Sequence, residues 1–212
     1  AEELSAKRQR VQDALQRIGG SDVVVEEILG AAEIDRYRNK SQYPIAHDGA
    51  VGFYRARSHE VVPVEQCRIQ MAQADAAAQA VRQYIRQFRV PCYDEKTGRG
   101  LLRHLYVRTN GAGESLVCLL GNGERASHEA ELVELLRQAV PSAVGIVWGV
   151  NRKKGNVILG DSYRTLWGED TLRDTLWGLT FRLSVPSFYQ VNCAQAEVLY
   201  RKAADFAGLT GE

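Results

Sequence analysis

One stretch organises the rest of the sequence: Ser187-Phe188-Tyr189-Gln190-Val191-Asn192. Asn192 followed by Gln195 has the pattern of a helix N-cap and its capping-box partner, so we predict that a helix begins at Asn192. Upstream, residues 177–185 alternate apolar and polar side chains like a half-buried strand, and Pro186 cannot continue a sheet ladder. The six residues are therefore predicted to form a strand-to-helix turn.

Such a turn presents side chains and backbone N–H groups to a ligand. Phe188 offers an aromatic stacking surface and Gln190 a bidentate amide, which makes the turn a candidate binding site. The alternative is a well-capped helix with two aromatic residues in the core, because aromatic side chains are often simply buried. The sequence leaves both interpretations open.

The composition is that of a folded globular protein: 212 residues, 45% hydrophobic and 25% charged. No apolar run is long enough to cross a membrane, and the first twenty residues lack the apolar centre of a signal peptide. We therefore expect a cytoplasmic protein with no membrane partner. The four cysteines form no CxxC pair and no metal-like spacing among themselves, so neither a disulfide framework nor a metal site is indicated.

Hydrophobic periodicity predicts the remaining elements. Helices are expected over residues 4–18 and 65–88, and a third is expected to follow Ser127 as its N-cap and to end before Pro141. Residues 36–62 are expected to form a hairpin with outward arginines. Further strands are expected over residues 101–109, 115–121, 143–150, 156–159, 164–167 and 177–185. The fold class that follows is mixed α/β (α+β), with a mixed sheet flanked by helices.

The basic residues are biased toward the first half of the chain. Residues 1–110 contain 17 Lys and Arg against 14 Asp and Glu, whereas residues 111–212 contain 10 against 12. Tyr37, Tyr54, Tyr84 and Tyr106 are interleaved with these cations. That pattern suits an RNA phosphate backbone contacted in the company of stacking aromatics, but a solvated basic face with ordinary strand tyrosines explains it equally well.

Several separated motifs carry a resemblance to a known family. In chain order they are Tyr37-Arg38-Asn39-Lys40, Gly52-Phe53-Tyr54, Ser58-His59, Cys67, Leu102-Arg103-His104, Gly155-Asn156-Val157, Ser187 to Asn192 and Gln195-Ala196-Glu197. In order and spacing they resemble the RNA uracil-5-methyltransferases, which make 5-methyluridine in ribosomal or transfer RNA. The resemblance runs along nearly the whole chain.

The resemblance implies that this chain is the middle of a longer enzyme, without the N-terminal RNA-binding barrel, the first three cluster cysteines and the Rossmann core that binds S-adenosylmethionine. Residues 1–35 would be a helix and lead-in, residues 36–185 a central RNA-contacting domain, and residues 186–212 the opening turn and helix of the methyltransferase domain. The implied partner is 23S rRNA or tRNA. The chain alone is expected to be inactive.

The resemblance also implies roles for single residues. Gln190 matches the glutamine that contacts S-adenosylmethionine, and Phe188 matches an aromatic residue near the target base. Arg103, His104 and Arg108 fall in a segment that looks like the family's RNA-facing strand. The basic pattern itself adds Arg38, Lys40, Arg55 and Arg57 as candidate RNA-binding residues. For His104, a hydrogen-bonded strand histidine is an equally good interpretation.

Cys67 matches the fourth thiolate ligand of a [4Fe-4S] cluster. Such a cluster normally takes four thiolates, so we expect none in this chain, where Cys67 would be a small buried residue. The family chemistry needs a thiolate that adds to C6 of uracil and a base that removes the C5 proton. Neither group is identifiable here, and Cys92, Cys118 and Cys193 are expected to be core thiols. The alternative function is a stand-alone RNA-binding or assembly module without catalysis.

Overall fold

The computed structural model describes residues 2–155 and 157–208. The chain forms two compact units, Ala1–Ile34 and Asp35–Glu212. None of the described helices is both long and apolar enough to span a bilayer.

The first unit contains one helix, α1 (Glu2–Arg17), as predicted. Acidic residues occupy its first turn and Arg17 its last, which suits the helix dipole. No residue of α1 is buried. The segment that follows is held to the helix mainly by side chains: Gln12 accepts from Val25 N at 2.8 Å, and Arg8 donates to the Val25 carbonyl oxygen at 2.7 Å.

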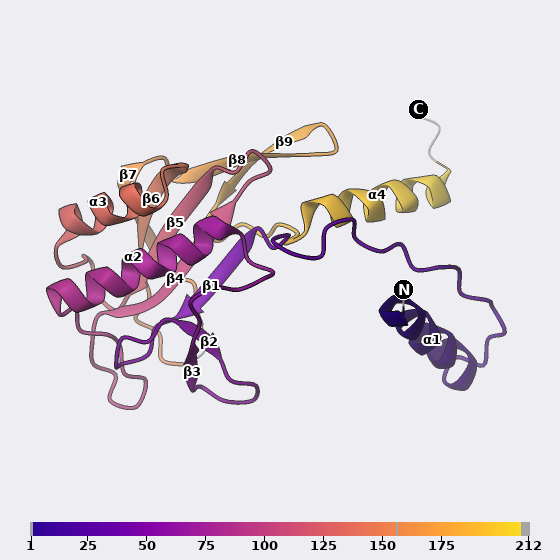
Figure 1. Ribbon diagram of the computed structural model, residues 1–212, viewed down its shortest axis with the longest axis horizontal. Helices are drawn as coiled ribbons and strands as arrows, with labels where there is room; N and C mark the ends of the chain where they lie inside the picture. Colours follow the sequence, from indigo (N-terminus) through magenta and orange to yellow (C-terminus); the bar gives the residue numbers. More distant parts are fainter. Residues whose placement is uncertain (1, 156, 209–212) are drawn as a thin grey trace. The chain divides into compact units, whose positions relative to one another are not determined.

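The second unit is built on a five-stranded sheet (Figure 1). Its strands, in spatial order, are β1 (Lys40–Pro44), β4 (Leu102–Thr109), β5 (Ser115–Gly121), β6 (Ala143–Val150) and β7 (Ser162–Gly168). Neighbouring strands are antiparallel except β5 and β6, which are parallel and are connected through α3 (Glu129–Ala139). The mixed sheet flanked by helices that the sequence predicts is therefore confirmed.

Each face of the sheet is covered by different elements. Helices α2 (Ala72–Phe88) and α3 lie over one face (Figure 1), where Leu105 and Trp148 belong to the larger hydrophobic core. On the other face, Tyr106 packs with Leu172 of β8 (Thr171–Leu176), which pairs with β9 (Leu179–Ser184). Because both faces are covered, every residue of β4 is buried. This burial includes charged residues.

The hairpin expected over residues 36–62 is only partly correct. Strand β1 pairs along its length with β4, and the short hairpin is instead made by β2 (Gly52–Tyr54) and β3 (Val61–Pro63). A tight turn over residues 46–50 separates β1 from β2, with Ala46 and Ala50 joined by a backbone hydrogen bond of 2.8 Å. The alternating pattern predicted strands but could not say which strand pairs with which.

Helix α2 begins at Ala72, seven residues later than expected. The residues before it run beside Arg38, whose backbone N–H donates to the Ile69 carbonyl oxygen at 2.9 Å. Asp75 in the first turn of α2 then accepts from the backbone N–H of Cys67 at 3.2 Å. Pairing with a distant segment therefore overrides the helix propensity of residues 65–71.

Ser127 does not cap α3, so that prediction is wrong. The N-cap is His128, which adopts a left-handed conformation (φ 51°) and makes no capping hydrogen bond with its side chain. The Tyr84 hydroxyl instead donates to the Ser127 carbonyl oxygen, and Glu129 accepts from Ala126 N at 3.1 Å. A tertiary contact from α2 thus decides how α3 starts.

Two further strand predictions need correction. Residue 156 lies outside the described residues, and residues 157–159 form no strand, because the Asn151 side chain donates to the carbonyl oxygens of Val157 and Ile158. Residues 177–185 are half of a hairpin: Trp177 (φ 49°) and Gly178 (φ 77°) form the turn between β8 and β9. Two successive positive φ angles are the signature of a type I′ hairpin turn.

Candidate functional site

The segment between β9 and α4 (Cys193–Ala207) is the predicted turn. Asn192 caps α4, and its side-chain oxygen accepts from the Gln195 backbone N–H at 3.1 Å, so the predicted helix start is confirmed. Phe188 is 80% exposed, whereas Tyr189 is 7% exposed and packs near Phe181 with ring centroids 5.9 Å apart. One aromatic residue therefore belongs to the core and the other faces solvent.

The backbone of the turn is fastened to the sheet at several points. Asn39, just before β1, donates from its backbone N–H to the Val191 carbonyl oxygen at 2.9 Å and from Nδ2 to the Gln190 carbonyl oxygen at 3.0 Å. Arg108 of β4 donates from Nη2 to the Ser187 carbonyl oxygen at 2.6 Å. The backbone is therefore fixed on both sides of the exposed Phe188 ring, and Gln190 is half-buried beside it.

A thiol and a carboxylate lie behind the turn. Cys193 Sγ donates to Asp174 Oδ2 at 3.7 Å and accepts from Asn39 Nδ2 at 3.0 Å. Burial, followed by the charge of Asp174, raises the pKa of the Cys193 thiol. Burial also raises the pKa of Cys92 to about 11. These two thiols therefore remain protonated at neutral pH, which does not suit them to act as nucleophiles.

The cysteine predictions are met to different degrees. Cys92 and Cys118 are buried in the core, as expected, while Cys193 and Cys67 are half-buried. No group of three or more His, Cys, Asp or Glu side chains suited to a metal ion occurs among the described residues. The described residues therefore do not supply the four thiolates that an iron–sulfur cluster takes.

The residues expected to contact RNA occupy three different environments. Arg55 and Arg57 are exposed in the β2–β3 turn, where Arg55 pairs with Glu60 at 2.9 Å. Lys40 stands opposite Arg108 in the β1–β4 pairing, and Lys40 is half-buried. The third group, Arg103 and His104, lies inside the protein.

Arg103 is 2% exposed, and its side chain contacts other parts of the protein and not the solvent. Its Nη1 donates to the carbonyl oxygens of Asn151 and Lys153, both at 2.8 Å, and its guanidinium lies over the Tyr93 ring, 4.2 Å from the centroid. His104 is 5% exposed, and burial together with the Arg103 charge lowers its pKa to about 4, so it is neutral at pH 7. Neither side chain is presented at the surface, and contact between them and RNA remains a prediction.

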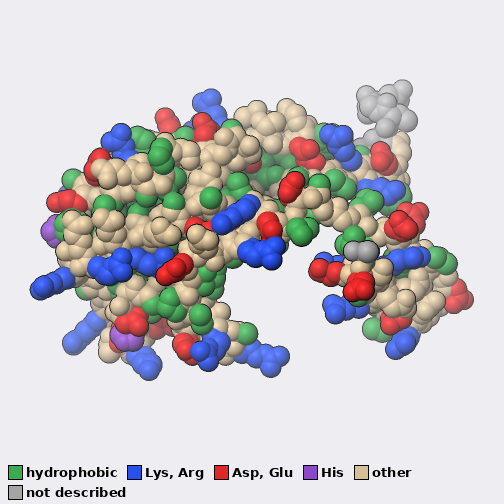
Figure 2. All heavy atoms as spheres, viewed as in Figure 1, with side chains coloured by type: hydrophobic (Ala, Val, Ile, Leu, Met, Phe, Trp, Pro, Cys, Tyr) green, Lys and Arg blue, Asp and Glu red, His purple; other side chains and the backbone are tan. Residues whose placement is uncertain are grey.

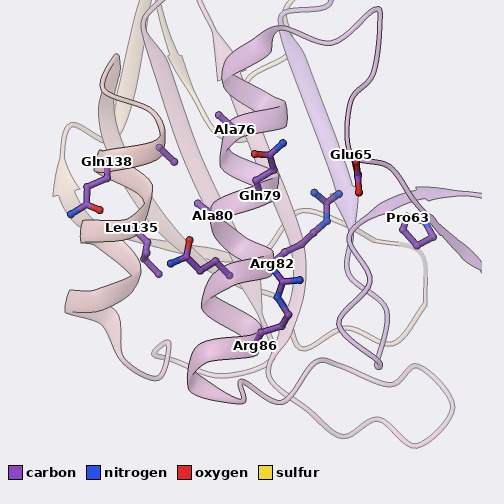
Figure 3. A pocket seen from close by; sticks show the side chains of 11 residues that line it. Pro63, Glu65, Ala76, Gln79, Ala80, Arg82, Arg86, Leu135 and Gln138 are labelled. Atoms are coloured by element: carbon purple, nitrogen blue, oxygen red, sulfur yellow. The ribbon is translucent and has the colours of Figure 1, made fainter.

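A groove of about 820 Å³ lies between α2 and α3 (Figure 3). Arg82 and Arg86 of α2 border it together with Gln138 of α3 and Glu65. It contains none of the residues predicted from the sequence, and it lies on the helical face of the sheet, whereas Tyr106 and Arg108 occupy the face covered by β8. We therefore do not assign it to the candidate site.

Basic side chains do not form one large patch in the view of Figure 2. They are scattered over the visible face, with acidic side chains among them. This mixed surface agrees with the near-neutral formal charge of +1.

Two residues at the site were missed by sequence reasoning. Asn39 was part of a motif but was given no role, and Asp174 lies on β8, a strand that the hydrophobic pattern did not reveal. Both act through contacts with segments far away in the sequence, and no local pattern marks such contacts.

Two relatives that align with almost the whole of this chain share one name. The chain is 40% identical over 215 residues to a protein from Clostridium tetani named "Uncharacterized RNA methyltransferase", with 100% of this chain aligned. It is 41% identical over 214 residues to a protein of that name from Halalkalibacterium halodurans, with 99% aligned. The chain is a homologue of these RNA methyltransferases. It spans about half of their length, 47% in both cases. The predicted resemblance is thereby confirmed at the level of RNA methyltransferases.

The fold is also found in a solved structure. That structure is the crystal structure of Pyrococcus abyssi tRNA (uracil-54, C5)-methyltransferase in complex with S-adenosyl-L-homocysteine. It superposes with a TM-score of 0.76 at 24% sequence identity, over 96% of this chain and 48% of that one. At this identity the likeness establishes the mixed α/β fold. No family model matches the sequence.

Proposed function

We propose that this chain is part of an S-adenosylmethionine-dependent RNA (uracil-5-)-methyltransferase that acts on a uridine of ribosomal or transfer RNA. One observation carries the proposal: an exposed Phe188 and a half-buried Gln190 stand on a turn whose backbone is fastened to the sheet by Asn39 and Arg108. The names of the relatives support the RNA methyltransferase part of the proposal.

Each side chain of the turn has chemistry suited to one substrate. An exposed aromatic ring can stack on a base taken out of its helix, a contact that tolerates any base because every base has a π-face. The Gln190 amide carries both donors and acceptors, so it can orient the charged groups of S-adenosylmethionine. Because the backbone of the turn is fixed, both side chains start from defined positions and lose less conformational entropy on binding.

The proposed reaction begins when a cysteine thiolate adds to C6 of uracil and makes C5 nucleophilic. S-adenosylmethionine, when bound, would supply the methyl group to C5 and be released as S-adenosylhomocysteine, and a base would remove the C5 proton so that the thiolate can leave. We assign neither group to this chain, because the Cys92 and Cys193 thiols have raised pKa values and Cys118 is fully buried. The chain by itself is therefore proposed to be inactive.

We propose that three successive segments of the chain have different roles. Residues 1–35 form a helix and lead-in, residues 36–185 contact RNA, and residues 186–212 open the methyltransferase domain. Phosphate contacts are proposed for Arg38, Lys40, Arg55 and Arg57, which reach the surface at least in part. Cys67, with its free thiol, is proposed as one cluster ligand in the longer protein.

The test uses the full-length protein that contains this chain. It is incubated with unmodified RNA and S-adenosylmethionine carrying a labelled methyl group, and the RNA is digested to nucleosides for mass spectrometry. We expect labelled 5-methyluridine. RNA binding without methyl transfer or S-adenosylmethionine binding would refute the enzyme and favour the stand-alone RNA-binding module.

A further inference from the structure

Arg108 is a buried cation without a counter-ion. Its side chain is 0% exposed, and Nη2 donates to the Tyr106 hydroxyl and the Ser187 carbonyl oxygen, both at 2.6 Å. Nε and Nη1 have no hydrogen-bond partner among the described residues. In the described part of the chain, no carboxylate lies within the 4.0 Å limit of an ion pair with Arg108. A charge buried in this way is unfavourable unless an opposite charge compensates it.

Two more cations stand beside Arg108. Lys40 is its partner in the β1–β4 pairing, and directly opposite residues in such a pairing are near neighbours. Arg38 donates from Nε to the Lys40 carbonyl oxygen at 3.1 Å. Burial, followed by the charges of Arg108 and Arg38, lowers the pKa of Lys40. Neither Arg38 nor Lys40 forms an ion pair with a described carboxylate, so three like charges are held together without compensation.

The comparison with Arg103 shows that burial alone does not create this situation. Arg103 donates to two carbonyl oxygens and lies 4.2 Å from the centroid of the Tyr93 ring. The aromatic ring nearest to the Arg108 guanidinium, that of Tyr106, has its centroid at 5.8 Å. Arg103 also has no second cation paired across its strand. Nε and Nη2 of Arg103 also lack a hydrogen-bond partner among the described residues, so what distinguishes Arg108 is its grouping with Lys40 and Arg38.

We propose that Arg38, Lys40 and Arg108 form an oxyanion site that binds a phosphate group of the RNA backbone. The inference rests on the proposed function and narrows it to one point of contact. Guanidinium and ammonium groups together are the usual protein partners of phosphate. The Ser187 carbonyl held by Arg108 directly precedes Phe188, so the site lies beside the proposed base-stacking ring and fits a nucleotide better than an isolated ion.

The arrangement also indicates the order of contacts. Lys40, on the edge strand β1, and Arg38, two residues before it, are half-buried, so an incoming phosphate meets them first. Arg108 lies fully covered behind them, with Nη2 held by the Ser187 carbonyl oxygen, so its charge adds to the attraction of the site for a phosphate while the turn stays in place.

The test uses the purified chain and inorganic sulfate as the probe. Melting temperatures are measured in sulfate and in chloride at matched ionic strength, for the wild type, Lys40→Met and Arg108→Met. Arg201→Met is the control because it removes an exposed cation of α4 that is given no role in RNA binding. Because sulfate stabilises folded proteins in general, the site is read from the difference: sulfate is expected to raise the melting temperature of the wild type and the control more than that of the two site variants. Lys40 is half-buried, so its variant keeps the test decisive if Arg108→Met does not fold.

The second arm measures binding of a fluorescent single-stranded RNA. Sulfate at matched ionic strength is expected to compete with RNA on the wild type and on Arg201→Met but not on Lys40→Met, whose salt slope is flatter by about 0.7. Equal stabilisation by sulfate in the wild type and Lys40→Met would overturn the site. Selective stabilisation with unchanged RNA binding of Lys40→Met would overturn the identification of the anion as RNA phosphate. Absence of RNA binding by the wild type at low salt would instead count against the proposed function.

Discussion

Asn39 Nδ2 donates a hydrogen bond of 3.0 Å to the carbonyl oxygen of Gln190, a residue 151 positions away in the sequence. The same asparagine also binds the Val191 carbonyl oxygen through its backbone N–H. The start of β1 therefore fixes the turn that carries the candidate site.

We expect Asn39→Ala to loosen this turn. Loss of the side-chain hydrogen bonds should reduce the free energy of unfolding by about 1–2 kcal/mol, since the Gln190 carbonyl then lacks its partner. In the full-length protein it should also weaken S-adenosylmethionine binding, measured by isothermal titration calorimetry. Asn122→Ala is the control, because Asn122 donates to the Gly100 carbonyl oxygen at 3.4 Å in a different loop. Equal effects of both variants on cofactor affinity would argue against a role of Asn39 in positioning.

Gln190→Ala should raise the S-adenosylmethionine dissociation constant of the full-length protein while leaving its RNA affinity nearly unchanged. The amide is proposed to contact the cofactor and not the RNA. Gln138→Ala removes an exposed glutamine of α3 and serves as the control for cofactor binding. A change in RNA affinity alone would contradict the assignment of Gln190 to the cofactor.

Phe188→Ala should weaken RNA binding by about 1–3 kcal/mol, the usual value of one base–aromatic stack. The melting temperature should not change, because the side chain is 80% exposed and contributes little to the core. Phe206→Ala is a close control, since Phe206 on α4 is 75% exposed but lies outside the turn. Fluorescence anisotropy with a labelled RNA measures the RNA affinity of both variants. Equal affinities would show that Phe188 does not stack on an RNA base.

Arg103→Leu should destabilise the fold, and the salt dependence of RNA binding by this variant tests the predicted contact between Arg103 and RNA. The substitution leaves the Asn151 and Lys153 carbonyl oxygens without their donor and removes the cation from the Tyr93 ring. Such changes at a buried site typically cost about 2–4 kcal/mol. Urea unfolding gives the loss of stability, and a slope of log affinity against log salt that falls by about 0.7 would show phosphate contact instead.

The stability of the chain should fall as the pH drops below about 6.5, the ordinary pKa of histidine. The folded state holds the pKa of His104 at about 4, so the unfolded chain binds the proton first and is favoured between these two values. The full effect is about 3 kcal/mol near pH 4. His104→Gln should remove this part of the pH dependence of urea unfolding, whereas His47→Gln, at an exposed position, should retain it. A pH profile unchanged by His104→Gln would refute the assignment.

The sequence predicted what short-range patterns determine. Asn192 with Gln195 located the start of α4, and the alternating β4 residues located a central strand. It could not reveal that β1 would pair with β4, because that pairing joins segments separated by the whole of α2. The burial of Arg108 was missed for a related reason. The alternating pattern shows that the strand has two faces. It does not show that β8 and β9 pack over the second face and bury the residues there.

The backbone amide of Asn39 is a natural reporter of turn motion. Because this N–H donates to the Val191 carbonyl oxygen at 2.9 Å, its exchange with deuterium requires the turn to detach from the edge of the sheet. The free energy of that opening determines how often Arg108 becomes accessible. A ligand that holds the turn closed should slow deuterium uptake at this amide, and one that enters beneath the turn should speed it.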